Sequence, residues 1–316
     1  MSNRKVPELN LYDYLLEGAE PAESPSTSKK LKQKEFSKAL FEGLKDYGFI
    51  VLTGHPVSTS LIDRSYALSK KLFSMSEEKK KSYSMPENGH QRGYTPFGVE
   101  HAKDSKVADL KEFWHIGREG LDDLENFWPG EVQGFKDTFL ELYGLLDQVG
   151  LTLLEALTGE LDLQANYFYN RVSRGNSILR LLHYPPLSEG VEKGALRAAP
   201  HEDINLITIL VAATQSGLQL KDRDGQWLDV SPPKNSLIVD AGDMLSRITN
   251  EVISSTTHQV INPDASNEDR YSMPYFIHPN SDAVLECIPS CVEDGVKYPP
   301  ITSDEFLKER LREIGL

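Results

Sequence analysis

The chain has 316 residues, which is long enough to bury a substantial hydrophobic core. Its 48 acidic and 34 basic residues give a formal net charge of −14, which argues against nucleic acid or an anionic membrane as a partner because like charges repel. Hydrophobic residues make up 39% of the sequence, so wholesale disorder is excluded.

The first half of the sequence is predicted to be mainly helical. Residues 17–35, rich in Ser, Pro, Glu and Lys, are typical of an exposed, mobile loop. Apolar residues recur at helical spacing over 36–47, with candidate capping residues at 26–28, and again over 61–73. The short run 49–53 between these two helices is β-prone.

One apolar stripe in the first half is especially regular. Its members are three or four residues apart, which places them on one face of a helix, and Gly159 is expected to end that helix. The stripe consists of Phe135, Phe139, Leu142, Leu146, Val149, Leu153 and Leu157. We therefore expect one long amphipathic helix in this region.

From about Ser177 the pattern changes to short apolar runs separated by turns. Many of these runs lie roughly 8–12 residues apart, which is typical of a β-sandwich or barrel. The runs are 178–183, 204–211, 217–220, 227–230, 236–239, 244–248, 257–261 and 271–277. A closing helix is expected near Thr302, because Thr302 and Glu305 have the spacing of a capping box.

These patterns predict an α+β fold in one domain that spans residues 1–316. Within it we expect a mainly helical region over 1–175 and a β core over 176–280. A tail and the closing helix would follow over 281–316. The chain would then consist of a helical frame around a β core.

Three common motifs of cofactor binding or nucleophilic catalysis are absent from the sequence. No two glycines stand two positions apart, so the dinucleotide-binding GxGxxG pattern does not occur. Neither the phosphate-binding GxxxxGK pattern nor the GxSxG nucleophile elbow occurs. Dinucleotide-binding folds, P-loop proteins and α/β-hydrolases therefore lose most of their support.

An imidazole and a carboxylate stand two positions apart just before an apolar strand. In an extended chain His201 and Asp203 point to the same side, whereas Glu202 faces away. His258 follows in another strand-like segment, and two imidazoles with one carboxylate suit a non-haem Fe(II) that keeps three open positions. A single HxD pair is also common as a hydrogen-bonded surface pair, so this motif alone leaves both interpretations open.

A second polar pair follows His258 on a strand-like segment. Arg270 and Ser272 share one face of the strand, and a guanidinium beside a hydroxyl is a suitable receptor for a carboxylate. If Arg270 is buried, it needs either a protein carboxylate or an anionic ligand. A surface bridge between Arg270 and an aspartate is the alternative.

Several segments occur in the order typical of the isopenicillin N synthase-like family of Fe(II)- and 2-oxoglutarate-dependent oxygenases. The chain resembles this family from about Val6 to its C-terminal helix. Leu182 departs from the family pattern, because many plant members carry asparagine there. The similar segments are VPELNL (6–11), YGFIVLTGHPVS (47–58), GYTP (93–96), DLKEFWHIG (109–117), LLHYPP (181–186), THQV (257–260) and RYSMPYFIHP (270–279).

The resemblance implies a double-stranded β-helix core, jelly-roll and cupin-like, flanked by helices that come mostly from the N-terminal half. It also implies that His201, Asp203 and His258 hold Fe(II). No side chain beyond this metal centre is expected to be catalytic.

The same resemblance implies a co-substrate site and a reaction. Arg270, Ser272 and Tyr184 would bind the distal carboxylate of 2-oxoglutarate, and O₂ would be the third reactant. Decarboxylation of 2-oxoglutarate to succinate would be coupled to hydroxylation, desaturation or cyclisation of a small organic substrate. The chain would thus be a non-haem iron dioxygenase, an oxidoreductase.

The substrate pocket is the least determined part of the expectation. In similar enzymes the region of Arg92 and Tyr94 borders the substrate, so Arg92 is a candidate receptor for a substrate carboxylate and Phe276 a candidate wall. The alternatives are a solvated Arg92 and core positions for the two aromatic residues. His115 and His278 lack a carboxylate two positions away, which makes them weak metal ligands.

Two other functions remain open at this stage. The chain could be an Fe(II) oxidase of the same fold that does not use 2-oxoglutarate, or a binding or sensing module without turnover. Cys287 and Cys291 are too few for a disulfide framework, and the first residues lack the apolar core of a signal peptide. We therefore expect a cytoplasmic monomer that acts on a small molecule, with no nucleic-acid or membrane partner.

Overall fold

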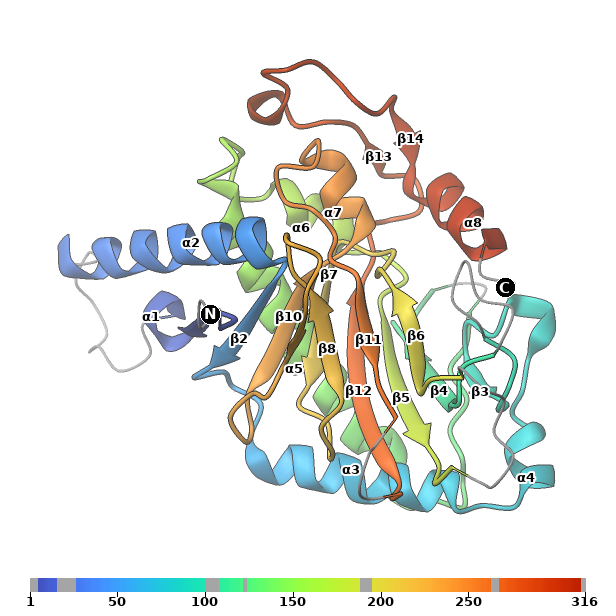
Figure 1. Cartoon of the computed structure of the whole chain (residues 1–316). Coiled ribbons are helices and arrows are strands. Elements are labelled where there is room, and N and C mark those ends of the chain that lie inside the picture. Colours follow the sequence, from blue (N-terminus) through green and yellow to red (C-terminus); the bar gives the residue numbers. More distant parts are fainter. Residues whose placement is uncertain are drawn as a thin grey trace.

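The structure is a computed structural model that describes residues 5–15, 27–100, 108–121, 124–187, 195–262 and 267–313. Its β-strands form a large sheet, a smaller sheet in front of it and a short two-stranded ribbon (Figure 1). The large sheet contains, in spatial order, β1 (Glu8–Asn10), β2 (Phe49–Thr53), β10 (Leu237–Ala241), β7 (Ile207–Val211), β12 (Arg270–Ile277), β5 (Ile178–Tyr184), β4 (Glu112–Gly117) and β3 (Gly93–Thr95). The smaller sheet contains β6 (Ala198–His201), β11 (His258–Val260), β8 (Leu218–Lys221) and β9 (Trp227–Asp229), and the ribbon pairs β13 (Val284–Leu285) with β14 (Ile301–Thr302).

The two larger sheets face each other as a jelly roll. A hydrophobic cluster joins them, with Leu182 and Ile238 from the large sheet packed together with Leu218, Leu220 and Val260 from the smaller one. This arrangement confirms the α+β fold with a jelly-roll core. It also leaves a space between the sheets into which polar side chains from both can point.

Strand β12 shows how the alternation of side chains separates core from cavity. Tyr271, Met273, Tyr275 and Ile277 belong to the main hydrophobic core, on the side of the helices. The residues between them, beginning with Arg270, line the cavity between the sheets. Since successive side chains of a strand point to opposite faces, one strand serves both surfaces.

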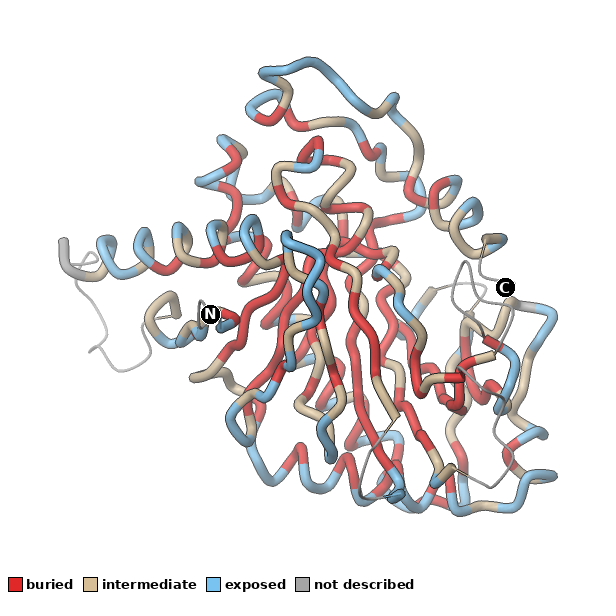
Figure 2. Tube along the Cα trace, in the orientation of Figure 1, coloured by how far each residue is buried: buried red, intermediate tan, exposed pale blue. Residues whose placement is uncertain are grey.

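Helices cover the outer face of the large sheet, and α5 runs behind it in Figure 1. Figure 2 shows buried positions concentrated in the strands, whereas α2 is exposed along much of its length. The helices are α1 (Tyr12–Leu15), α2 (Thr27–Tyr47), α3 (Thr59–Phe73), α4 (Glu77–Lys81), α5 (Phe135–Thr158), α6 (Tyr167–Val172), α7 (Asp243–Ile248) and α8 (Ser303–Glu313). None of these helices is long and apolar enough to cross a membrane.

Most of the predicted elements are confirmed. The regular stripe forms α5, which ends just before Gly159, and the β-prone run 49–53 forms β2. At the closing helix, the Thr302 backbone N–H and hydroxyl donate to Glu305 Oε2 at 3.1 and 2.6 Å, and the Glu305 N–H donates to Thr302 Oγ1 at 3.3 Å. The expected capping box is therefore present.

Two predicted elements are wrong. The exposed loop expected over 17–35 gives way to helix α2 from Thr27, because Lys, Gln and Glu are good helix formers even without an apolar stripe. The run 244–248 is helix α7 rather than a strand, since the buried Met244, Leu245 and Ile248 have helical spacing. The candidate cap Ser26 and most of the loop lie outside the described residues.

The β core also draws on the first half of the chain. Strand β2 lies between β1 and β10, whereas β3 and β4 form the opposite edge of the large sheet beside β5. Residues before 176 therefore supply strands as well as helices. This placement brings the segment 108–117 to the cavity.

Candidate metal and 2-oxoglutarate site

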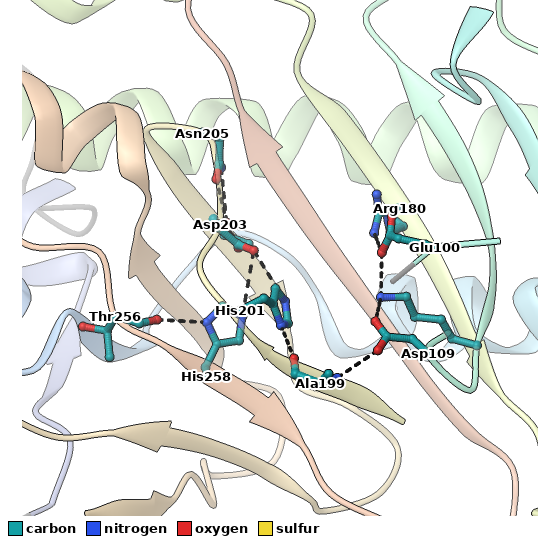
Figure 3. Close-up of polar contacts among 11 residues, drawn as sticks. Glu100, Asp109, Arg180, Ala199, His201, Asp203, Asn205, Thr256 and His258 are labelled. Atoms are coloured by element: carbon teal, nitrogen blue, oxygen red, sulfur yellow. Dashed lines mark hydrogen bonds and ion pairs between the residues drawn. The ribbon is translucent and has the colours of Figure 1, made fainter. Parts of the chain in front are cut away.

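Two neighbouring strands of the smaller sheet and the turn after one of them bring His201, Asp203 and His258 together. His201 ends β6 and pairs directly with His258 at the start of β11. One ligand atom from each of the three residues lies within 4.8 Å of the other two. The Nε2 atoms of His201 and His258 each lie 3.9 Å from Asp203 Oδ1 (Figure 3). Their sequence spacing therefore places two imidazoles and one carboxylate around a common point.

Backbone carbonyls fix the orientation of both imidazole rings. His201 Nδ1 donates to the carbonyl of Ala199 at 2.7 Å, and His258 Nδ1 donates to that of Thr256 at 3.1 Å. With the proton held on Nδ1, each Nε2 keeps its lone pair toward Asp203. Burial, followed by the neighbouring His201, lowers the pKa of His258 to about 4, so this ring is neutral at physiological pH.

Hydrogen bonds on the opposite side hold the Asp203 carboxylate. The Thr208 hydroxyl donates to Asp203 Oδ2, and the side chain of Asn205 bonds to the same hydroxyl. Burial raises the pKa of Asp203, but the two imidazoles and the Thr208 hydroxyl lower it below its ordinary value. Burial, followed by the charge of Asp203, raises the pKa of Asp240 well above its ordinary value, which favours the protonated form of Asp240.

Arg270 is a buried cation in the same cavity. Only 1% of its surface is exposed, and no carboxylate of the described residues forms an ion pair with it. Its Nη1 donates to Ser272 Oγ at 3.3 Å, its Nε donates to the Gln215 carbonyl at 3.3 Å, and its guanidinium lies 5.0 Å from the centre of the Tyr184 ring. The structure thus brings Arg270, Ser272 and Tyr184 together, as expected.

These residues fit the expected metal and co-substrate chemically. Two imidazoles and one carboxylate are a ligand set that suits Fe(II), and they would leave its other coordination positions open. The unpaired guanidinium of Arg270 suits the distal carboxylate of 2-oxoglutarate, because a buried cation without an anion is strongly destabilising. Both features line one cavity of about 900 Å³ between the two sheets.

The wall beside the metal residues contains a polar cluster that the sequence analysis did not identify. Glu100, Asp109, Lys111, His115 and Arg180 all line the same cavity. Figure 3 labels Glu100, Asp109 and Arg180 of this cluster in the same view as the His–Asp–His group. The alternation of strand β5 could have indicated Arg180, because it stands on the same face as Tyr184. Glu100 lies in an irregular segment and carries no such signal.

The three candidate substrate residues, Arg92, Tyr94 and Phe276, lie in different places. Phe276 lines the cavity. Arg92 lies outside the lining, fully buried, and donates to Asn176 Oδ1 at 2.7 Å. Tyr94 pairs with Trp114 across β3 and β4 and donates its hydroxyl to Glu112, so it belongs to the opposite, helix-covered face of the sheet. Arg92 and Tyr94 therefore do not enter the proposed site.

The remaining candidate ligands do not form a metal site among the described residues. His115 and His278 line the cavity, but the structure groups only His201, Asp203 and His258 at metal-binding distances in the described part of the chain. Cys287 and Cys291 are free thiols. The expectation that His115 and His278 are weak rivals agrees with this arrangement.

Two family models match the chain in sequence. Residues 21–131 match the N-terminal region of a non-haem dioxygenase in morphine synthesis, and residues 175–279 match the 2OG-Fe(II) oxygenase superfamily. The second of these matched ranges, 175–279, contains the positions of the candidate metal and 2-oxoglutarate residues. A 2-oxoglutarate-Fe(II) type oxidoreductase of Emericella nidulans, hxnY, is 32% identical over a 279-residue alignment that covers 83% of this chain and 79% of that protein.

Solved structures agree with these sequence matches. A 2OG-Fe(II) oxygenase family protein of Caulobacter crescentus is 39% identical, with a TM-score of 0.83 and coverage of 98% of both chains. A full-length Neurospora crassa protein, solved in complex with alpha-KG (2-oxoglutarate) and thymine, is 31% identical, with a TM-score of 0.85 and coverage of 97% of this chain and 96% of that one. The chain therefore belongs to the isopenicillin N synthase-like family of 2OG-Fe(II) oxygenases and is an oxidoreductase that uses Fe(II), 2-oxoglutarate and O₂.

Proposed function

We propose that His201, Asp203 and His258 bind the Fe(II) of this oxygenase. The observation that carries the proposal is the convergence of their ligand atoms within 4.8 Å, with both Nδ1 protons committed to backbone carbonyls. Ligand atoms must be deprotonated to bind a metal, and the neutral His258 and ionised Asp203 meet that requirement at pH 7.

Arg270, with Ser272 and Tyr184, binds the distal carboxylate of 2-oxoglutarate. Buried charge-assisted hydrogen bonds of this kind are strong, because no water competes for the guanidinium. Anchoring this end of 2-oxoglutarate orients its other end toward the metal residues of the same cavity. Fe(II), when bound, supplies the activation of O₂, and the protein supplies orientation and the exclusion of water.

The chain couples the oxidative decarboxylation of 2-oxoglutarate to the oxidation of a substrate. One 2-oxoglutarate and one O₂ give succinate and CO₂, and the second oxygen atom enters a C–H bond of the substrate as a hydroxyl group. Desaturation and cyclisation are alternative outcomes at the same site. The cavity of about 900 Å³ and the thymine bound by the related Neurospora crassa protein support a small organic molecule as the substrate.

Turnover of 2-oxoglutarate tests this function before the substrate is known. Protein reconstituted with Fe(II) is incubated with 2-oxoglutarate in air, and succinate and O₂ are measured together. We expect slow succinate formation that requires both Fe(II) and 2-oxoglutarate. Consumption of O₂ without 2-oxoglutarate would instead support the oxidase of the same fold.

The cellular setting is part of the same proposal. The chain acts as a monomer in the cytoplasm, without nucleic-acid or membrane partners. Its net charge of −14 and its two free thiols support this setting. Light scattering on a size-exclusion column would test it, with a mass near 35.5 kDa as the expected result and a multiple of that mass as the contrary one.

A further inference from the structure

The polar cluster beside the metal residues is a network of four charged side chains. Lys111 Nζ lies 2.6 Å from Glu100 Oε1 and 2.7 Å from Asp109 Oδ2. Arg180 Nη1 lies 3.0 Å from the same Glu100 oxygen (Figure 3). Two carboxylates and two cations balance, so this wall of the cavity carries no net charge and has no built-in preference for an anionic molecule.

One atom of this network has no partner. Glu100 Oε1 accepts from both cations, whereas Glu100 Oε2 is buried and accepts no hydrogen bond from any residue that the structure describes. Burial raises the pKa of Glu100, but Arg180 and Lys111 lower it well below its ordinary value, so the carboxylate stays ionised. A buried, ionised oxygen without a donor is destabilising, and such atoms are rare in folded proteins. A ligand that donates a hydrogen bond would satisfy it.

The neighbouring guanidinium is held in a fixed orientation. Arg180 Nε donates to His115 Nε2 at 2.7 Å, and His115 Nδ1 donates to the His90 carbonyl at 2.7 Å. Burial and then the charge of Arg180 lower the pKa of His115 well below its ordinary value, which keeps this ring a neutral acceptor. The Nη2 of Arg180 donates to none of the described residues, and its Nη1 lies 3.0 Å from the other oxygen of the Glu100 carboxylate, so Arg180 and Glu100 together offer a free donor and a free acceptor.

The cluster is joined to the metal residues through a single residue. The Ala199 N–H donates to Asp109 Oδ1 at 3.0 Å, and the Ala199 carbonyl accepts from His201 Nδ1 at 2.7 Å. Figure 3 shows this connection between the two groups. Glu100, Arg180 and His201 also line one cavity, so a molecule held at Glu100 and Arg180 would share that cavity with the metal residues.

We propose that the prime substrate is an uncharged molecule with an amide-type edge, whose N–H donates to Glu100 Oε2 and whose carbonyl accepts from Arg180. This assignment rests on the proposed function, since it places the substrate next to the Fe(II) site. Phe276, whose ring lies 5.2 Å from the Arg180 guanidinium, supplies an apolar wall for a flat ring. Cyclic amides, imides and related N–H heterocycles have this combination of an apolar face and a polar edge.

Calorimetry on the anaerobic protein loaded with Fe(II) and 2-oxoglutarate tests the proposal. The probes are thymine and uracil, their 1,3-dimethyl derivatives, which lack N–H donors, and 5-ethyluracil, which adds bulk but keeps both donors. Benzoate serves as an anionic ring of similar size. We expect the three N–H probes to bind and the dimethyl derivatives and benzoate to bind at least ~10-fold more weakly, given the usual strength of a hydrogen bond to a charged group.

Two matched variants locate the effect. Glu100→Gln should weaken thymine binding by roughly 10- to 100-fold, because the acceptor loses its charge. Glu160→Gln, at an exposed glutamate outside the cavity, should leave it unchanged. Both variants should retain the visible absorption band of the Fe(II)–2-oxoglutarate complex, which reports that the fold and the metal site are intact.

The outcomes separate this inference from the proposed function. Equal binding of N–H and dimethyl probes, tighter binding of benzoate, no binding of any N–H probe, or an unchanged affinity in Glu100→Gln would each overturn the amide assignment while the absorption band persists. Loss of the absorption band in the wild-type protein would instead contradict the proposed function itself.

Discussion

Arg270 is the residue whose environment most directly indicates an anionic ligand. Its guanidinium is almost completely buried, and its hydrogen bonds go to a hydroxyl and a backbone carbonyl, which carry no charge. Burial of an uncompensated cation is strongly destabilising. This environment supports the proposal that Arg270 receives a carboxylate from outside the protein.

Replacement of Arg270 by alanine should separate co-substrate binding from metal binding. We expect Arg270→Ala to raise the Kd for 2-oxoglutarate about 100-fold, because a buried charge pair is lost. The Kd for Fe(II) should change little, since Arg270 does not contact the metal residues. Anaerobic titrations measure both constants. Arg174→Ala, at an exposed surface pair, is the matched control. An equal change in both constants would mean that Arg270 acts through folding.

His278 links stability to pH. Burial lowers its pKa from an ordinary 6.5 to about 4, so the unfolded chain takes up a proton there at a higher pH than the folded chain does. The stabilisation is fully present above pH 6.5 and is lost as the pH falls toward 4. The folded state should therefore lose about 2 kcal/mol at this residue between pH 7.5 and 5.0.

Chemical unfolding of the metal-free protein at pH 7.5 and at pH 5.0 measures this contribution. His278→Gln removes the titrating group, so the variant should lose about 2 kcal/mol less between the two pH values than the wild type does. The comparison cancels the contributions of the other histidines. Equal losses in the two proteins would show that His278 does not hold a depressed pKa.

At the scale of elements, α5 approaches the sheet closely at one glycine. A Cβ atom at Gly150 would lie 1.9 Å from Ile277 Cδ1 and 3.2 Å from Ile209 Cδ1. Gly144, on the exposed face of the same helix, has no neighbouring atom within 4 Å of such a Cβ. Gly150 therefore lets the helix pack against the strands, whereas Gly144 has no such role.

Alanine at these two positions should have opposite effects on stability. Gly144→Ala should stabilise the protein by ~0.5–1 kcal/mol, because alanine is the better helix former. Gly150→Ala should destabilise it by ~1–3 kcal/mol, since the added methyl overpacks the core at Ile277. Urea unfolding of the two variants measures both effects. A stabilising Gly150→Ala would contradict the close packing of α5.

Local patterns predicted most elements, and the failures have physical reasons. The α5 stripe and the capping box at Thr302 depend on residues close in sequence, so spacing alone was sufficient. The run 244–248 is too short for periodicity to distinguish strand from helix. Strand β4 owes its structure to pairing with β5, and the edge strand β3 to pairing with β4, and such long-range pairing is not encoded in local sequence.

At the scale of the whole molecule, the two facing sheets decide which polar residues meet. His201 and Asp203 could be placed together from their spacing, and His258 and Arg270 were candidates from their strand-like segments to which the family resemblance gave definite roles. Glu100 and Arg180 could not be paired from sequence, because they meet only when the segment before β4 reaches the cavity beside β5. The proposed substrate wall therefore depends on tertiary contacts that no local motif indicates.

The measurement that tests the central claim most directly is an anaerobic titration of the metal-free protein with Fe(II) and then 2-oxoglutarate. The weak visible charge-transfer band of their complex should appear in the wild type and in Glu202→Ala. In the wild type, Glu202 accepts a hydrogen bond from the Thr257 hydroxyl and is not one of the three proposed metal ligands. The band should be absent in Asp203→Ala. A band that persists in Asp203→Ala, or one that disappears in Glu202→Ala alone, would contradict the assignment of His201, Asp203 and His258 as the iron site.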